Sequence, residues 1–398
     1  MGNPLKNMFS RTINAIFGGA AKVMRPPIKA TPLTDRLLVD AIRLAELPSP
    51  APNEEPRAAF VLERLKSLGL TPVVNDSGNI LIRLHSDKSG DEAPVLLFTD
   101  LGTKRWHPSE SLARIDAENA VGAGLSDSLG SAALLSIAEN FYSSMEPSLK
   151  RDILLLFNAK TMDDPNINFN SILNDPFDRP IAAIGVRGFS LDRIIQSVGT
   201  YRVKITVSEG ESGISAGINS NKVTETLIDT ARTLLGIAWD TEGKTRMFIR
   251  RLEALTVYGL TPQEGVLELE IESSEAAHLD MAMNAVKATA GKISEKANLQ
   301  TETMLLSFIP PGKPENSRDL FEILRKLCKE QHLKIQEENG ADTAAFFSGD
   351  DIPALSMGIA LGREGKERDV INIDSVEKGF FILKRFIIEA GTYYGFRN

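Results

Sequence analysis

Hydrophobic residues along the chain form two kinds of pattern, short apolar runs and longer stretches with helical spacing. The runs Ile153–Phe157 and Ile181–Val186 are nearly continuous, which is typical of strands covered on both faces of a sheet. Stretches 56–68 and 128–142 instead have the length and spacing of helices. Because strands and helices alternate from about residue 35 onward, the pattern predicts an α/β sheet domain.

The pattern changes near residue 200. Tyr201, Val203, Ile205 and Val207 alternate with polar residues, as in a strand with one exposed face. After them we expect a helix at 221–236, strands near 246–258 and 265–272, and a helix at 275–294. The alternation of strands and helices seen before residue 200 then returns, with a strand at 302–309 and helices at 315–331 and 374–390.

The sequence therefore predicts an α/β domain that is interrupted by a smaller α/β domain. We place the first part of the main domain at 35–199, the inserted domain at 200–300 and the second part at 301–398. We find neither an internal repeat nor a low-complexity segment.

Residues 1–34 form a separate basic arm, because the first acidic residue is Asp35. Its cations are Lys6, Arg11, Lys22, Arg25 and Lys29. Apolar residues recur in the arm at helical spacing, so we expect either an amphipathic helix packed on the domain or a loose arm. A second interpretation is a helix that contacts a membrane surface peripherally through residues 1–25. The arm lacks the apolar core and cleavage site of a secretory signal.

Composition narrows the class of protein. The 398 residues contain 45 Lys and Arg against 53 Asp and Glu, a net charge of −8, so we expect no nucleic-acid partner. The single cysteine, Cys328, excludes an internal disulfide and suits a reducing, cytoplasmic location. Any histidine-based metal site must draw on His85, His107, His278 and His332.

Seven short segments stand in a recognisable order along residues 35–390. They are Pro48-Ser49-Pro50 with Glu54-Glu55, Asp76–Ile80, Leu96–Asp100, Gly122–Asp127, Gly340-Ala341-Asp342, Ile352-Pro353-Ala354 and Ile373–Glu377. Together they resemble the zinc aminoacylase, carboxypeptidase and peptidase T-like family of metallopeptidases. The resemblance implies a mixed-sheet di-zinc-peptidase-like domain with helices on both faces, interrupted by a lid domain through which the chain forms a homodimer.

The resemblance also implies two zinc ions, held by a His in a His-x-Asp motif, a bridging Asp, a Glu, a further carboxylate and a C-terminal His. A second Glu acts as general base on metal-bound water. Here the first His position is Phe98, although Asp100 remains, and Asp127 stands at the bridging position. The Glu pair falls on Thr161 and Met162.

The remaining positions of the resembled site also differ. The further carboxylate falls at Val186-Arg187, and the C-terminal His on Gly365 or Lys366. Only one of the five metal-ligand positions is retained, so we expect no cofactor and assign no metal ligands. The resembled lid His falls on Ser215, and the Arg that binds a substrate carboxylate falls on Glu272, which disfavours a ligand with a free carboxylate.

Several residues have a structural as well as a functional interpretation. Asp127 could cap the helix that follows it, Asp100 could bind a loop, and Asp342 could be a helix N-cap. His107 could replace the lost imidazole, and Asp163-Asp164 could stand in for the Glu pair. The sequence contains neither a phosphate-binding loop nor a G-x-S-x-G nucleophile motif.

The sequence thus predicts a cytoplasmic homodimer with a peptidase fold that has lost di-zinc hydrolase activity. We expect it to bind a small molecule, a peptide or a protein partner in a cleft between its domains. The remnants of the catalytic site are Asp100 and Asp127, and the cleft candidates are Phe98, Thr161, Met162, Arg187 and Asp342. The alternative is an active metal-dependent peptidase or amidohydrolase, using a single metal on Asp100, Asp127 and a recruited His, or metal-free chemistry.

Overall fold

The structure is a computed structural model of the chain. It describes residues 32–47, 49–50, 53–86, 93–103, 113–116, 118–143, 149, 151–159, 179–209, 221–239, 244–254, 261–313, 315–365 and 367–395. Residues from 32 onward belong to one compact unit, Thr31–Asn398. The predicted basic arm therefore lies almost wholly outside the described residues, and its membrane interpretation stays a prediction.

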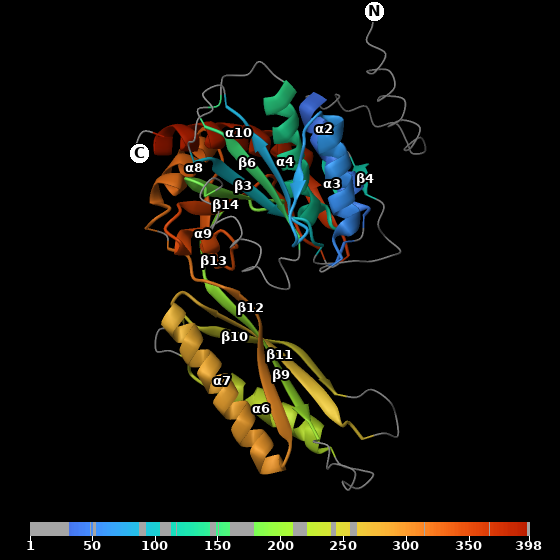
Figure 1. Cartoon of the computed structure of the whole chain (residues 1–398), viewed down its shortest axis with the longest axis vertical. Coiled ribbons are helices and arrows are strands. Elements are labelled where there is room, and N and C mark those ends of the chain that lie inside the picture. Colours follow the sequence, from blue (N-terminus) through green and yellow to red (C-terminus); the bar gives the residue numbers. More distant parts are fainter. Residues whose placement is uncertain are drawn as a thin grey trace, which may run out of the picture. The chain divides into compact units, whose positions relative to one another are not determined.

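The main sheet has six strands in the order β1-β2-β6-β3-β7-β14. Strands β6, β3 and β14 of this sheet are labelled in Figure 1. They are β1 (Val73–Val74), β2 (Ile80–Leu84), β6 (Ile153–Asn158), β3 (Val95–Asp100), β7 (Ala182–Arg187) and β14 (Ala354–Gly358). Strands β6, β3, β7 and β14 are parallel, whereas β2 is antiparallel to β6 and β1. The predicted α/β fold with a mixed sheet is confirmed.

Helices cover both faces of this sheet, which is why its central strands are apolar throughout. One face packs against a large core to which five helices contribute. They are α2 (Pro32–Ala45), α3 (Glu55–Ser67), α4 (Leu125–Ser143), α8 (Arg318–Glu330) and α10 (Ile373–Gly395). The other face carries a smaller apolar cluster that contains Phe98 and the short helix α9 (Ala345–Gly349).

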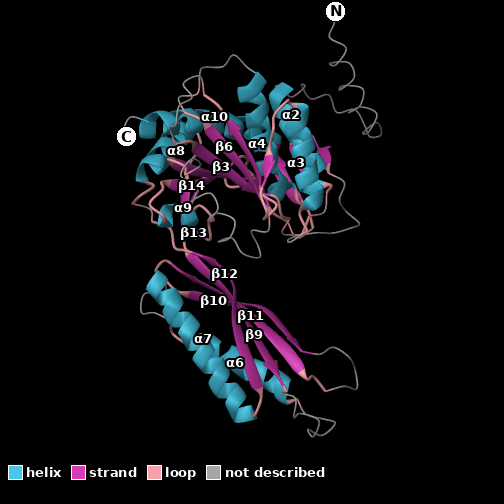
Figure 2. Cartoon of the chain, in the orientation of Figure 1, coloured by secondary structure: helices cyan, strands magenta, loops and turns pink. Residues whose placement is uncertain are grey.

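A second, antiparallel sheet has the order β10-β11-β9-β12 (Figure 2). Its strands are β9 (Gly199–Ser208), β10 (Arg246–Ala254), β11 (Glu264–Ser273) and β12 (Gln300–Ile309). Helices α6 (Lys222–Leu235) and α7 (Ala276–Ala297) share a separate core with Val203, Ile205 and Val207. The alternation that predicted a half-exposed strand therefore corresponds to β9.

Strand β12 pairs with β9 along its whole length. We had predicted this strand, at 302–309, to belong to the second part of the main domain. An alternating pattern indicates a strand but does not specify which sheet it joins. The boundaries 200–300 and 301–398 stay predictions.

Two small sheets complete the described strands. In one, β15 (Gly362–Arg363), β16 (Asp369–Asn372), β5 (Asn119–Gly122) and β4 (Arg114–Asp116) follow each other. In the other, β13 (Gln336–Gly340) runs parallel to β8 (Arg193–Ser197). Strand pairing places Asp369 opposite Gly122, three positions before α4 begins at Leu125.

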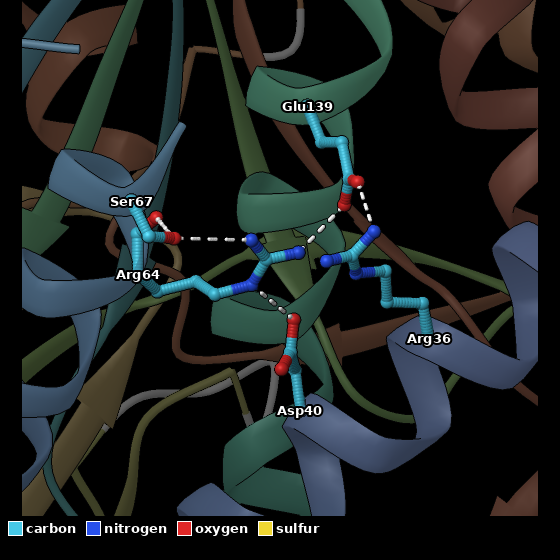
Figure 3. Close-up of polar contacts among 5 residues, drawn as sticks. All are labelled: Arg36, Asp40, Arg64, Ser67 and Glu139. Carbon is cyan, nitrogen blue, oxygen red and sulfur yellow. Dashed lines mark hydrogen bonds and ion pairs between the residues drawn. The ribbon is translucent and has the colours of Figure 1, made fainter. Parts of the chain in front are cut away.

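A group of charged side chains connects helices α2, α3 and α4 (Figure 3). Arg64 on α3 donates to Asp40 Oδ2 at 3.2 Å and to Glu139 Oε2 at 2.6 Å, and Arg36 also pairs with Glu139. Burial raises the pKa of Asp40 in spite of the neighbouring Arg64. The group is structural and lies outside the cavity described below.

Among the described residues, we find no helix with the length and apolar character needed to cross a membrane.

Candidate functional site

A cavity of about 350 Å³ opens where β3 and β7 end. Ligand sites of α/β folds occur at the carboxyl ends of parallel strands, so its place agrees with the topology. Asp100 and Arg187 are the last residues of β3 and β7, and both line the cavity. Asp127, Arg202 and Glu364 line it as well.

Phe98 does not line the cavity, contrary to our expectation. Its side chain is 2% exposed, and its ring centroid lies 5.3 Å from that of Phe347 on α9. A Cβ atom on Gly185, in the neighbouring strand, would come within 2.9 Å of the Phe98 ring. The residue at the resembled His position is therefore part of the core, and it offers no lone pair to a metal.

Asp100 and Asp127 both reach the cavity. Asp100 is exposed, and Asp127 is partly exposed in the first turn of α4. The amide and hydroxyl of Ser126 donate to Asp369 Oδ2 at 3.0 and 2.9 Å. Asp369 on β16 therefore accepts hydrogen bonds at the N-terminus of α4. Asp127 lies within the first turn and adds a negative charge near the positive end of the helix dipole.

Arg187 stands at the end of β7, near where the resemblance would place a metal-binding carboxylate. Its Nη2 lies 2.8 Å from Asp342 Oδ1 and 3.3 Å from the carbonyl oxygen of Ala341. Asp342 is 1% exposed, and its Oδ1 also accepts from the Ala344 amide at 3.0 Å and the Ser356 hydroxyl at 2.6 Å. A buried carboxylate therefore anchors a cation at this position.

Arg202 is a cavity residue that the sequence analysis missed. It lies on the polar face of β9, and its Nε donates to Glu270 Oε2 at 3.0 Å. Arg250 donates to the other oxygen of Glu270. Burial raises the pKa of Glu270, but hydrogen bonds from Arg250 and Arg202 and the charges of both together hold it below its ordinary value. The alternation of residues 201–207 places Arg202 on the polar face, but nothing local indicates the cavity.

Arg57 holds the backbone around the two aspartates. It is 1% exposed and donates to the carbonyl oxygens of Leu44 at 2.9 Å and Leu101 at 3.2 Å, and to the Ser128 hydroxyl at 2.8 Å. Burial lowers the pKa of Arg57 to about 10, and the charge of Asp127 opposes this shift. Its only sequence signal is its spacing of four residues from Val61 on the buried face of α3.

Other predicted site residues fall outside the described part of the chain, namely Thr161, Met162, His107, Asp163, Asp164, Ser215 and Lys366. Glu272 lies on β11, where it pairs with Arg246 at 3.0 Å. It does not line the cavity, so the expectation that Glu272 disfavours a ligand with a free carboxylate does not apply to this cavity.

The residues at the cavity do not fit a pair of zinc ions. Zinc takes carboxylate, imidazole or thiolate ligands, and the resembled positions supply only Asp100 and Asp127, beside the cation Arg187. Within the described ranges, no three His, Cys, Asp or Glu side chains are grouped so that they could hold a metal ion.

Comparison with known proteins places this geometry in a structural context. No family model and no curated protein matches the chain. The aminopeptidase PepT from Bacillus cereus is similar in structure, with a TM-score of 0.66, 12% identity, and 90% of this chain and 99% of that chain covered. A tripeptidase from Staphylococcus aureus has a TM-score of 0.68 and 13% identity, covering 90% of this chain and 98% of its own.

A third structure corrects our expectation about cofactors. The Bacillus subtilis YXEP protein, described as a dinuclear metal-binding peptidase from the M20 family, has a TM-score of 0.57 and 12% identity and covers 90% of this chain and 98% of its own. We had expected no cofactor, and this expectation is wrong because metal binding accompanies this fold in a similar structure. The resemblance to the zinc peptidases is confirmed at the level of the fold. The chain has the fold of M20 family metallopeptidases.

Proposed function

We propose that this metallopeptidase-fold protein has lost di-zinc hydrolase activity and binds a small ligand in the cavity at the ends of β3 and β7. The observation that carries the proposal is the ion pair between Arg187 and the buried Asp342, at 2.8 Å. It puts an anchored cation near where the resembled site has a metal-binding carboxylate.

Electrostatics supports the loss of two-metal chemistry. The guanidinium of Arg187 adds a positive charge to the cavity. Two divalent cations beside it would be repelled, and the three carboxylates that line the cavity, Asp100, Asp127 and Glu364, carry less negative charge than the two ions carry positive charge. Phe98, buried in the core, cannot replace the missing imidazole.

The cavity nevertheless has the features of a ligand site. Its volume of about 350 Å³ lies in the range of small-molecule pockets, roughly 300–1,000 Å³. Carboxylates of Asp100, Asp127 and Glu364 line it together with the guanidinium groups of Arg187 and Arg202. Charges of both signs can orient a small polar molecule.

The test is a hydrolysis assay on the full chain with added zinc and a panel of dipeptides, tripeptides and N-acyl amino acids. We expect no turnover above that of Asp127→Ala, and the bound metal is measured in the same samples. Asp116→Ala is the matched control, because Asp116 lies on β4 and does not line the cavity. Zinc-dependent cleavage that Asp127→Ala abolishes and Asp116→Ala retains would refute the proposal.

The same assay tests the second candidate function, an active peptidase with an altered metal site. That candidate is favoured by the presence of both retained aspartates, Asp100 and Asp127, in one cavity. It requires turnover that depends on Asp100 as well as on Asp127, so Asp100→Ala completes the series.

We also propose self-association through β12, an edge strand of the second sheet. Three consecutive apolar residues are exposed there, Met304 at 49%, Leu305 at 43% and Leu306 at 36%. An exposed apolar edge strand favours pairing with another chain. We expect sedimentation to give a dimer for the parent chain and a monomer for Leu306→Lys. A monomeric parent chain would refute this part of the proposal.

A further inference from the structure

We propose that Arg187 and Arg202 together form a binding site for a singly charged oxyanion, and that this group of the ligand is what the cavity recognises. The inference rests on the proposed ligand binding in this cavity. It assigns the recognition to residues on two different sheets, β7 and β9.

Each guanidinium is fixed by one carboxylate and keeps other donors available. Arg187 uses Nη2 for Asp342 and Ala341, and Arg202 uses Nε for Glu270. Within the described part of the chain, the remaining nitrogens of these two groups have no hydrogen-bond partner. Their side chains are 34% and 35% exposed, and both line the cavity.

The anchoring carboxylates make the site rigid before a ligand arrives. Asp342 is 1% exposed and Glu270 is 9% exposed, so the partner of each arginine is fixed in the protein interior. A guanidinium held in this way loses less conformational freedom on binding than a mobile surface arginine. Guanidinium groups bind carboxylate and phosphate oxygens through paired, charge-assisted hydrogen bonds.

Around Arg202 the positive charges outnumber the negative ones by one, so a positive charge remains for the ligand. Glu270 is shared by Arg202 and Arg250, so two cations surround one carboxylate. Asp100, Asp127 and Glu364 line the same cavity and would repel a multiply charged anion. A ligand with a single negative charge would neutralise the excess positive charge at Arg202 and would be repelled less by the three carboxylates than a multiply charged anion.

Calorimetric titration of the full chain with N-acetylglycinate, inorganic phosphate and N-acetylglycinamide tests the inference. The first two probes present carboxylate and phosphate oxygens, and the third has a neutral amide in place of the carboxylate. We expect N-acetylglycinate to bind at least about tenfold more tightly than the amide, since charge-assisted hydrogen bonds are the stronger ones. Phosphate should bind better near pH 6, where it is largely monoanionic, than near pH 8.

Variants assign the binding to the two arginines. Arg187→Gln and Arg202→Gln should each weaken N-acetylglycinate about tenfold or more, and Arg187→Lys should weaken it less because the charge remains. Arg246→Gln is the matched control. Arg246 lies on the same sheet as Arg202 and pairs with Glu272 in a similar way, but it does not line the cavity. Circular dichroism confirms that each variant is folded.

The outcomes separate this inference from the proposed function. Equal binding of the carboxylate and the amide, unchanged binding by Arg187→Gln and Arg202→Gln, or no binding of any probe would overturn the oxyanion site. None of these results would show that the protein hydrolyses peptides, so the proposed loss of hydrolase activity would stand. Zinc-dependent peptide cleavage would overturn the proposed function, whatever the two arginine variants do.

Discussion

The guanidinium of Arg187 lies 2.8 Å from a carboxylate oxygen of Asp342, a side chain that is almost completely buried. The pair connects the end of β7 to the turn that leads into α9. Asp342 also accepts hydrogen bonds from the Ala344 amide and the Ser356 hydroxyl, so one oxygen organises this side of the cavity.

Asp342→Asn should therefore destabilise the fold measurably. Asparagine keeps an oxygen acceptor but removes the negative charge that strengthens the hydrogen bond from Arg187, and we expect the free energy of unfolding to fall by about 1–3 kcal/mol. Arg193→Gln is the comparison, since Arg193 pairs with Glu338 at 2.8 Å on the surface, and its loss should cost under about 1 kcal/mol. Urea unfolding of both variants provides the measurement, and equal losses would contradict the role given to Asp342.

Phe98→His places an imidazole at the position of the resembled metal ligand. Because Phe98 packs on Phe347 in the core, we expect the change to lower stability by about 2–4 kcal/mol and to produce no peptidase activity. Phe98→Leu should cost less, since it keeps the site apolar. A stable Phe98→His protein that cleaves dipeptides would contradict this expectation and would show that position 98 belongs to a working metal site.

Arg57 should be among the most sensitive positions in the chain. Arg57→Met leaves the Leu44 and Leu101 carbonyls and the Ser128 hydroxyl without their buried donor. We expect a loss of about 3–5 kcal/mol in chemical denaturation. Arg36→Met is the control, because the Arg36 side chain is 51% exposed, and its loss should stay within about 1 kcal/mol.

Asp152 makes stability depend on pH. It is 4% exposed and binds Arg83 Nε at 2.9 Å and the Ser86 amide at 2.8 Å. Burial raises the pKa of Asp152, but hydrogen bonds from Ser86, Arg83 and His85 together hold it below its ordinary value.

Because the folded pKa of Asp152 is below the unfolded value of about 3.9, the stabilisation is present above that pH and is lost as the pH falls through the folded pKa. Asp152→Asn should accordingly lower stability near neutral pH, and its difference from the parent should shrink below about pH 4. Urea unfolding across this range checks the sign. A difference that grows on acidification would contradict it.

Cys328 should be unreactive in the folded protein. It is 1% exposed, and burial raises the pKa of its thiol to about 11, so little thiolate exists near neutral pH. We expect a thiol reagent to label it only as fast as the chain unfolds, with urea accelerating the reaction. Fast stoichiometric labelling of the native protein would show that α8 opens locally.

Hydrophobic periodicity predicted the elements of the fold well. The apolar runs at 153–157 and 181–186 correspond closely to β6 and β7, because a parallel strand covered on both faces has to be apolar throughout. The segments that resemble zinc peptidases also indicated the correct fold, and from it the place of Asp100 and Asp127 at one cavity.

The sequence by itself thus determined the secondary structure, the mixed α/β architecture and the presence of Phe98 where the resembled family has its first imidazole, since each depends on local pattern or residue type. Only the tertiary structure decided that Phe98 joins the core, that β12 pairs with β9, and that Arg187 is held by Asp342. The contribution of Arg202 to the cavity and of Arg57 to its backbone also became visible only there. These facts depend on contacts between residues far apart in the chain, and a charged residue has the same appearance in a sequence whether its partner is water or a buried carboxylate.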